Sequence, residues 1–324
     1  MLKEKLFLII QNMMELKNNA LLTGDLSSLE KLYQLNDSRS KKAFEKEKQN
    51  LKARIRSATE RKIKFHRQTT KVSLGRESRT KDLIRVSVME TVTWWYYQLG
   101  KLQYERQQNY HKLTIFHDGN WLIKDDHYRL EPKIATIPRP FTHPLNSFNN
   151  WKILRTKIIK GNNYNREAAV TYAHKWWNGF NPNFRFFSVD CTNYVSQILY
   201  AGGFPIFYTG KQNSGWWYLG NGGQDDKWSF SWSVAHSLRW YLDSKNNLQV
   251  ELIKTPNELL PGDIISYDWD GDGVWQHNTV VVGHNIYGQP LVNAHTTNSQ
   301  YRYWDYKDSP VWNEKTRYLF WKIL

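Results

Sequence analysis

The residue best placed for covalent chemistry in this 324-residue chain is its single cysteine, Cys191. It follows Asp190 and opens a segment, 191–201, in which Val195 and Ile198 fall at helical spacing. A cysteine at a helix start meets the positive end of the macrodipole, which lowers the pKa of the thiol and favours the nucleophilic thiolate. We therefore expect a reactive thiol. Composition alone favours the alternative, a small buried apolar side chain.

A thiol nucleophile needs a base and a group that orients that base. His277 directly precedes a predicted strand over 279–283, so its ring can stand at the sheet edge and face the helix start. The next predicted strand, 291–295, carries Asn293 and His295. Side chains alternate along a strand, so these two share one face and either of them could orient His277.

The first 131 residues combine helical and strand patterns. Apolar spacing predicts helices over 6–22, 26–35 and 43–65, and β-branched and aromatic runs predict strands over 69–74, 83–97, 110–117 and 120–126. Helices followed by a curled antiparallel sheet resemble the cone-shaped nuclear-transport-factor-2-like domain. That resemblance implies a ligand site, a partner surface or a spacer, without choosing among them.

A region rich in proline and asparagine, 132–160, is predicted to link this domain to a second one over 161–324. Asn165 is expected to cap the first helix of the second domain, and Gly179 to end it. Further helices are predicted over 191–201 and 232–242, and strands over 264–268, 279–283, 291–295 and 318–323.

The chain has a net charge of +15, and most of the excess lies in its first 150 residues. An anionic polymer is therefore a candidate partner for the basic domain. Glutamates interrupt the most basic run, 41–64, and no nucleic-acid motif accompanies it. We favour a solvated helix face there, and nucleic acid is not an expected partner.

The one apolar run near the amino terminus, 6–10, is shorter than the core of a signal peptide and far shorter than a membrane span. We expect no transmembrane segment and a cytoplasmic or spore-associated protein, with export by another route left open. A single cysteine also excludes an intramolecular disulfide.

Several motifs occur together in a specific order. They are DCTNYVSQ at 190–197, PGDII at 261–265, HNTVVV at 277–282 and HTTN at 295–298. In combination they resemble the putative amidase domain of Gram-positive bacteria, over roughly 160–310. The resemblance implies an α+β, papain-like domain in which helices pack on an antiparallel sheet, related in plan to cell-wall amidases and peptidases.

By this resemblance Cys191 is the nucleophile and His277 the base, while Asn293 or His295 takes the third position. No cofactor is required. The family often has an aspartate before the histidine, where this chain has Gln276, so the surroundings of the base differ.

Two further groups of residues have alternative interpretations. Asp268, Asp270 and Asp272 reproduce half of a calcium loop, but position 12 is Thr279 instead of glutamate, so we favour a tight hairpin over a calcium site. Five tryptophans could wall a substrate cleft, although core packing is the favoured interpretation for each: Trp216, Trp217, Trp228, Trp232 and Trp275.

The sequence thus predicts a cysteine-dependent hydrolase of an amide or peptide substrate, which could be derived from peptidoglycan or from spore material. Its oxyanion would be stabilised by the main-chain N–H of Cys191 and the amide of Asn193. Two alternatives remain open: a non-catalytic protein that binds peptide or glycan, and an acyltransferase that passes a thioester to an amine.

Overall fold

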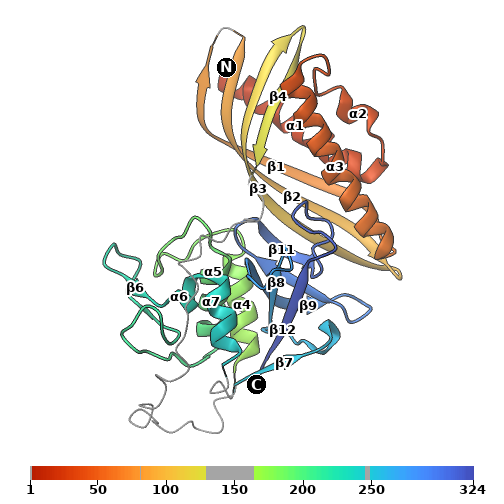
Figure 1. Ribbon diagram of the computed structural model, residues 1–324. Helices are drawn as coiled ribbons and strands as arrows, with labels where there is room; N and C mark the ends of the chain where they lie inside the picture. The colour runs from red at the N-terminus through yellow and green to blue at the C-terminus, as the bar shows by residue number, and fades with distance from the viewer. Residues whose placement is uncertain (1, 81, 129–163, 245–248) are drawn as a thin grey trace.

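The computed structural model describes residues 2–80, 82–128, 164–244 and 249–324. It is an α+β protein built around one large antiparallel sheet, with helices packed against it in both halves of the chain (Figure 1). The predicted linker, 132–160, lies outside the described residues. Within the described residues, no helix has both the length and the apolar character that crossing a bilayer would require.

The amino-terminal region, residues 2–128, has three helices followed by four strands. Its elements are α1 (Leu2–Thr23), α2 (Ser27–Glu30), α3 (Ser38–Glu60), β1 (Lys64–Arg79), β2 (Leu83–Gln98), β3 (Lys101–Asp118) and β4 (Asn120–Tyr128). The helices pack on one side of the curled strands (Figure 1).

Local sequence explains most of these boundaries. Asp37 caps α3 by accepting a hydrogen bond from the Ser40 N–H at 2.9 Å. The predicted helix over 43–65 was too long, because α3 ends at Glu60 and Lys62 adopts a positive φ of 54° before β1 begins. The helix predicted over 26–35 was also too long, since only Ser27–Glu30 is helical.

The carboxy-terminal region, residues 164–324, begins with helices and ends with strands. Its helices are α4 (Arg166–Trp176), α5 (Cys191–Ala201), α6 (Phe230–Ser233), α7 (Ala235–Leu242) and the short 3-10 helix η2 (Pro256–Glu258). Its strands are β5 (Tyr218–Leu219), β6 (Lys227–Trp228), β7 (Val250–Ile253), β8 (Ile264–Asp268), β9 (His277–His284), β10 (Pro290–Ala294), β11 (Asn298–Tyr303) and β12 (Arg317–Ile323). The strands β7 and β11 and the short strands β5 and β6 were not predicted from the sequence.

The main sheet runs through both regions in the order β1-β2-β3-β11-β10-β9-β8-β12-β7, and β4 also pairs with β3. The junction is the antiparallel pairing of β11 with β3, in which Ser299 lies opposite Gln107. Side chains reinforce it, since Arg106 donates to Gln300 at 3.2 Å. The two regions therefore share main-chain hydrogen bonds as well as side-chain contacts.

The two faces of the carboxy-terminal sheet are covered differently. Val280 and Val282 of β9 pack against Ile198 of α5. Val281, between them, belongs to a second apolar cluster that includes Tyr267. Because side chains alternate along a strand, residues 278, 280 and 282 face α5 and residues 277, 279 and 281 face away from it.

A buried cluster of charged side chains lies under the amino-terminal helices. Lys17 contacts Asp126 at 2.7 Å, and the His111 ring contacts Asp126 at 2.8 Å and Glu90 at 3.4 Å. Burial lowers the pKa of His111, but the two carboxylates raise it by more, to about 9. His111 is therefore protonated at neutral pH.

This cluster makes stability depend on pH. The pKa of His111 is higher in the folded state than its unfolded value of 6.5, so its contribution is complete below pH 6.5 and disappears as pH rises through about 9. We expect the free energy of unfolding of the wild type to exceed that of His111→Gln by as much as about 3 kcal/mol at pH 6, and by far less at pH 9.5. Urea unfolding of both proteins across this range measures the difference. A difference that is constant with pH would contradict the ion pair.

Candidate active site

Cys191 is the first residue of α5, where the sequence predicts it, and Asp190 is the N-cap. The Asp190 side chain does not cap the helix. Its carboxylate accepts hydrogen bonds from Asn193 Nδ2 at 2.8 Å and from His295 Nδ1 at 2.7 Å. The first main-chain N–H groups of α5 therefore make no capping hydrogen bond to the Asp190 side chain.

The sulfur of Cys191 lies against the main chain of β9. Sγ is 4.0 Å from the Gln276 carbonyl oxygen and 3.7 Å from Thr192 Oγ1. The main-chain N–H of Asn278 also acts to lower the pKa of the thiol. The thiol thus lies beside the peptide units on both sides of His277.

A chain of buried hydrogen bonds holds α5 at this position. Asn278 Nδ2 donates to Thr192 Oγ1 at 3.1 Å, and Ser266 Oγ donates to Asn278 Oδ1 at 2.6 Å. Trp321 Nε1 in turn donates to Ser266 Oγ at 3.0 Å. The chain joins β12, β8, β9 and α5, so the start of the helix is fixed to the sheet beside the histidine.

The pKa of the thiol does not follow the sequence expectation. Cys191 is only 2% exposed, and this burial raises its pKa above the ordinary value. Hydrogen bonds from Asn278 and Thr192 offset only part of the increase. The expectation of a lowered pKa at the helix start is therefore wrong for this arrangement, because desolvation of the thiolate outweighs the effect of the helix terminus.

His277 is fully buried at the start of β9. It is paired with Tyr267 across the sheet, and its Nε2 lies 3.4 Å from the Tyr306 hydroxyl. The ring stacks against Trp269 with centroids 5.8 Å apart. The expectation that the ring faces α5 is wrong, since the ring lies on the opposite face of the sheet. The sulfur meets the main chain of His277 instead of its imidazole.

Asn293 and His295 share the face that looks toward α4 and α5, as strand alternation predicts. Asn293 accepts from the Tyr301 N–H at 3.0 Å and donates to the Ala173 carbonyl at 3.3 Å. Neither partner is His277. The amide therefore connects β10 to β11 and to α4.

His295 contacts α4 and the start of α5. Its Nδ1 lies 2.7 Å from Asp190 Oδ2, and its Nε2 lies 2.7 Å from the Trp176 carbonyl oxygen. Both ring nitrogens lie within hydrogen-bond distance of an oxygen atom. The ring also stacks on Tyr194, with centroids 3.8 Å apart. His295 thus makes a buried hydrogen bond with the residue next to the cysteine.

Asn193 is not available for the role expected of it. Its amide nitrogen donates to the Arg185 carbonyl at 3.1 Å as well as to Asp190, and its oxygen accepts from Trp232 Nε1 at 2.8 Å. Both amide hydrogens are occupied, so the expectation that this amide stabilises an oxyanion is wrong here. Tyr306, whose hydroxyl faces His277, was missed because it lies in none of the sequence motifs.

The half calcium loop is a hairpin turn. Asp268 accepts from the N–H groups of Gly271 and Gly273, each at 2.8 Å, and Asp272 accepts from the Val274 N–H at 2.8 Å. In the part of the chain that the structure describes, no three histidine, cysteine or acidic side chains gather as a metal site. Residues 269–276 thus join β8 and β9 as a hairpin connection that is longer than a tight turn. The calcium alternative at Asp268, Asp270 and Asp272 stays a prediction.

The tryptophans pack in the interior, as favoured for each of them. Trp216, Trp217, Trp232 and Trp275 are buried, and Trp228 is half-buried. Trp216 and Trp232 belong to the apolar cluster that α5 shares with β8 and β12. They support the helix that carries the cysteine instead of walling an open cleft.

Comparisons with known proteins identify the second half of the chain. The family model described as "Putative amidase domain" matches residues 163–321. The Bacillus subtilis (strain 168) protein with the printed name "Uncharacterized protein YhbB" is 45% identical over 162 residues, which cover 50% of this chain and 50% of the relative. A second protein of that strain, "Uncharacterized protein YjcM", is 26% identical over 211 residues, or 61% of this chain and 46% of the relative.

The matched segments span about half the length of these curated relatives. No solved structure matches the chain significantly. The family match begins just before α4, ends within β12, and contains the cysteine, both histidines and the asparagine described above. Residues 163–321 of this chain belong to the putative amidase domain family.

Proposed function

We propose that this protein is a cysteine-dependent amide hydrolase in which Cys191 is the nucleophile and His277 the base. The observation that carries the proposal is the position of the sulfur, at the first residue of α5 and against the peptide units on both sides of His277. Membership of residues 163–321 in an amidase family supports amide bonds as the target.

The mechanism begins with a rearrangement at the sheet edge. The Cys191 sulfur must leave its buried position, and the His277 ring must turn away from Tyr306 and toward the edge of β9. His277 then takes the thiol proton, and the thiolate attacks the amide carbonyl to form a tetrahedral intermediate. The main-chain N–H groups at the start of α5 stabilise the oxyanion.

The second half of the reaction returns the enzyme to its starting state. The protonated His277 gives its proton to the leaving amine, and the C–N bond breaks to leave a thioester on Cys191. His277 next takes a proton from water as the water attacks the thioester, and the C–S bond breaks to release the acid. The protonated His277 then returns its proton to the Cys191 thiolate. The overall reaction converts one amide and one water into one acid and one amine.

We assign His295 as a positioning residue. It does not contact the sulfur, but its hydrogen bond with Asp190 holds the residue that precedes Cys191. Asn293 would have an indirect role, because its hydrogen bonds hold β10 to β11 and to α4.

We propose a separate fold for each half of the chain. A papain-like arrangement for 161–324 is supported by a cysteine helix packed on an antiparallel sheet that carries the histidine. A nuclear-transport-factor-2-like arrangement for 1–131 is supported by helices packed on one side of four curled strands. The boundary between the two domains falls in the segment 132–160.

For the substrate we propose an amide of the bacterial cell wall or of spore material, in a Gram-positive bacterium and in a cytoplasmic or spore-associated setting. The relatives found in Bacillus subtilis support the Gram-positive source alone. The excess of positive charge in the first 150 residues suits attachment to an anionic polymer.

A specific observation favours a second candidate, a non-catalytic protein that binds peptide or glycan. The thiol is buried and its pKa is raised, which are properties of a structural cysteine and not of a resting nucleophile. The accessibility of this sulfur under turnover conditions separates the two candidates.

Replacement of the sulfur tests the hydrolase directly. We expect Cys191→Ala and Cys191→Ser to abolish the release of amide-cleavage products from fragmented peptidoglycan, measured by mass spectrometry, while circular dichroism stays unchanged. Cys191→Ser replaces the thiol by a hydroxyl of similar size, so this variant controls for the loss of packing in Cys191→Ala. Wild-type product yields from Cys191→Ala would refute the assignment.

The rate of alkylation tests the buried thiol. Because its pKa is raised, we expect Cys191 of the native protein to react with iodoacetamide far more slowly at pH 7 than the urea-unfolded chain does. The native rate should increase with pH beyond the range in which the unfolded thiol has already ionised. A native thiol that reacts fastest near pH 7 would show a preformed thiolate, contrary to this arrangement.

The two histidines should respond differently to the same substitution. We expect His277→Gln to lower kcat at least about 100-fold, the size of a lost general base. His295→Gln should lower both kcat and the unfolding temperature, because it removes the buried hydrogen bond from the ring to Asp190. Loss of activity in His295→Gln at unchanged stability, with activity retained in His277→Gln, would reverse the two roles.

A further inference from the structure

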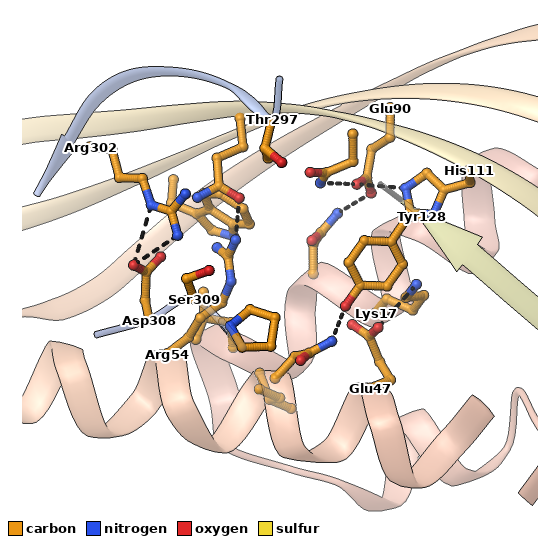
Figure 2. Close-up of a pocket in the computed structure, with 18 residues that line it drawn as sticks. Lys17, Glu47, Arg54, Glu90, His111, Tyr128, Thr297, Arg302, Asp308 and Ser309 are labelled. Atoms are coloured by element: carbon orange, nitrogen blue, oxygen red, sulfur yellow. Dashed lines mark hydrogen bonds and ion pairs between the residues drawn. The ribbon is translucent and has the colours of Figure 1, made fainter. Parts of the chain in front are cut away.

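A polar cavity lies between the amino-terminal helices and the sheet, away from Cys191 (Figure 2). Residues of α1, α3, β2, β3 and β4 line most of it. The carboxy-terminal region closes one side with Thr297 and with the segment Asp308–Pro310. Figure 2 shows Arg54 near Arg302 and Asp308 on one side, and Lys17, Glu90 and His111 on the other.

The carboxylates around this cavity already have cationic partners. Glu90 contacts His111 at 3.4 Å, Glu47 contacts Lys17 at 3.5 Å, and Asp308 contacts Arg302 at 3.0 Å. Arg54 has no ion pair among the described residues, although its positive charge helps Arg302 to lower the pKa of Asp308 against the effect of burial. The positive charge of Arg54 is therefore the one on the cavity wall that is not matched by direct contact within the described residues.

Three hydrogen-bond donors on the wall lack acceptors in the described part of the chain. They are Arg54 Nη1, Trp94 Nε1 and Gln107 Nε2, and all three atoms are buried. Trp94 and Gln107 are each only 2% exposed. The Arg54 guanidinium lies over the Trp94 ring at 4.3 Å, and its Nη2 donates to the Gln107 oxygen, so the three donors belong to one contiguous group.

Unsatisfied buried donors are costly, and a cluster of three that includes the unmatched cation Arg54 favours an anionic acceptor. The cavity measures about 70 Å³, counted as the space that the centres of water molecules can reach. One water needs about 10–15 Å³ on that measure, so the cavity holds a molecule of only a few heavy atoms.

We propose that this cavity binds a small monocarboxylate, whose two oxygens accept hydrogen bonds from Arg54, Trp94 and Gln107. One negative charge matches the one unpaired guanidinium. A phosphate dianion would bring excess negative charge close to Glu90 and Asp308, and so fits less well. A planar carboxylate also suits the guanidinium plane that stacks on Trp94.

The binding site would connect the two regions of the protein. Gln107 of β3 lies opposite Ser299 of β11, and Thr297, just before β11, lines the cavity. Occupation of the site would therefore strengthen the same junction that joins the two halves of the sheet. This inference does not depend on the proposed hydrolase.

Thermal unfolding of the full chain tests the proposal, with sodium formate, acetate and glycolate as probes in Tris chloride buffer. Sodium chloride at equal ionic strength is the reference, and sodium phosphate is the competing anion. We expect at least one carboxylate to raise the wild-type unfolding temperature by about 3 °C at tenfold its dissociation constant. Phosphate should give a smaller shift.

Three substitutions assign the effect to the cavity. Arg54→Gln should abolish the carboxylate shift, and Trp94→Phe, which removes one donor and keeps the ring, should reduce the apparent affinity. Gln107→Glu supplies a carboxylate from the chain itself, so we expect it to raise the unfolding temperature without ligand and to eliminate the response to acetate. Lys52→Gln, on the exposed side of α3, is the matched control and should respond like the wild type.

Several outcomes would overturn the proposal. If carboxylates shift the unfolding temperature no more than chloride does, water alone satisfies the donors. A shift with phosphate but not with carboxylates would also contradict it. A carboxylate shift that persists in Arg54→Gln would place the binding elsewhere. Circular dichroism of each variant separates loss of binding from loss of fold, and isothermal titration of Trp94→Phe provides a measurement on a variant that keeps the packing.

Discussion

The contact between the start of α5 and the edge of β9 fixes the position of the Cys191 sulfur. Asn278 reaches Thr192 across this contact, and Ser266 and Trp321 complete the buried hydrogen-bond chain behind it. Because each member satisfies the next, removal of any one leaves a buried polar group unpaired. The sulfur is positioned by this chain before any substrate is present.

The same contact also explains why the pKa of the Cys191 thiol is raised. A sulfur in contact with two peptide units and almost without exposure has its pKa raised by desolvation, although it sits at a helix start. An enzyme built in this way would couple activation of its nucleophile to opening of the sheet edge. The hydrogen bond between Asp190 and His295, on the other side of Cys191, would keep the helix start in place during that opening.

Local patterns in the sequence predicted the elements that carry the site. Asn165 caps α4 by accepting from the Ala168 N–H at 2.9 Å, Cys191 begins α5, and the strand over 264–268 has the predicted bounds. These features depend on residues close in sequence, which is why periodicity and capping find them. The family resemblance of the second half, read from ordered motifs, is confirmed by the family match.

Non-local relations could not be predicted in this way. The polar strand β11 forms because β3, almost 200 residues earlier in the chain, pairs with it. No pattern within 298–303 predicts this pairing. Alternation put Asn293 and His295 on one face but could not say which face α5 covers, so the orientation of the His277 ring was wrong. The raised pKa of the thiol depends on the residues that bury it. It could not be predicted, because the sequence does not show which residues surround Cys191 in the fold.

The central claim is that the sulfur of Cys191 becomes covalently bonded to the acyl group of its substrate. Rapid acid quenching during turnover of peptidoglycan fragments, followed by intact-mass and peptide-level mass spectrometry, tests this most directly. The account predicts an added acyl mass on Cys191 that hydroxylamine removes, as expected for a thioester. Amide-cleavage products that accumulate while Cys191 never gains mass would contradict it.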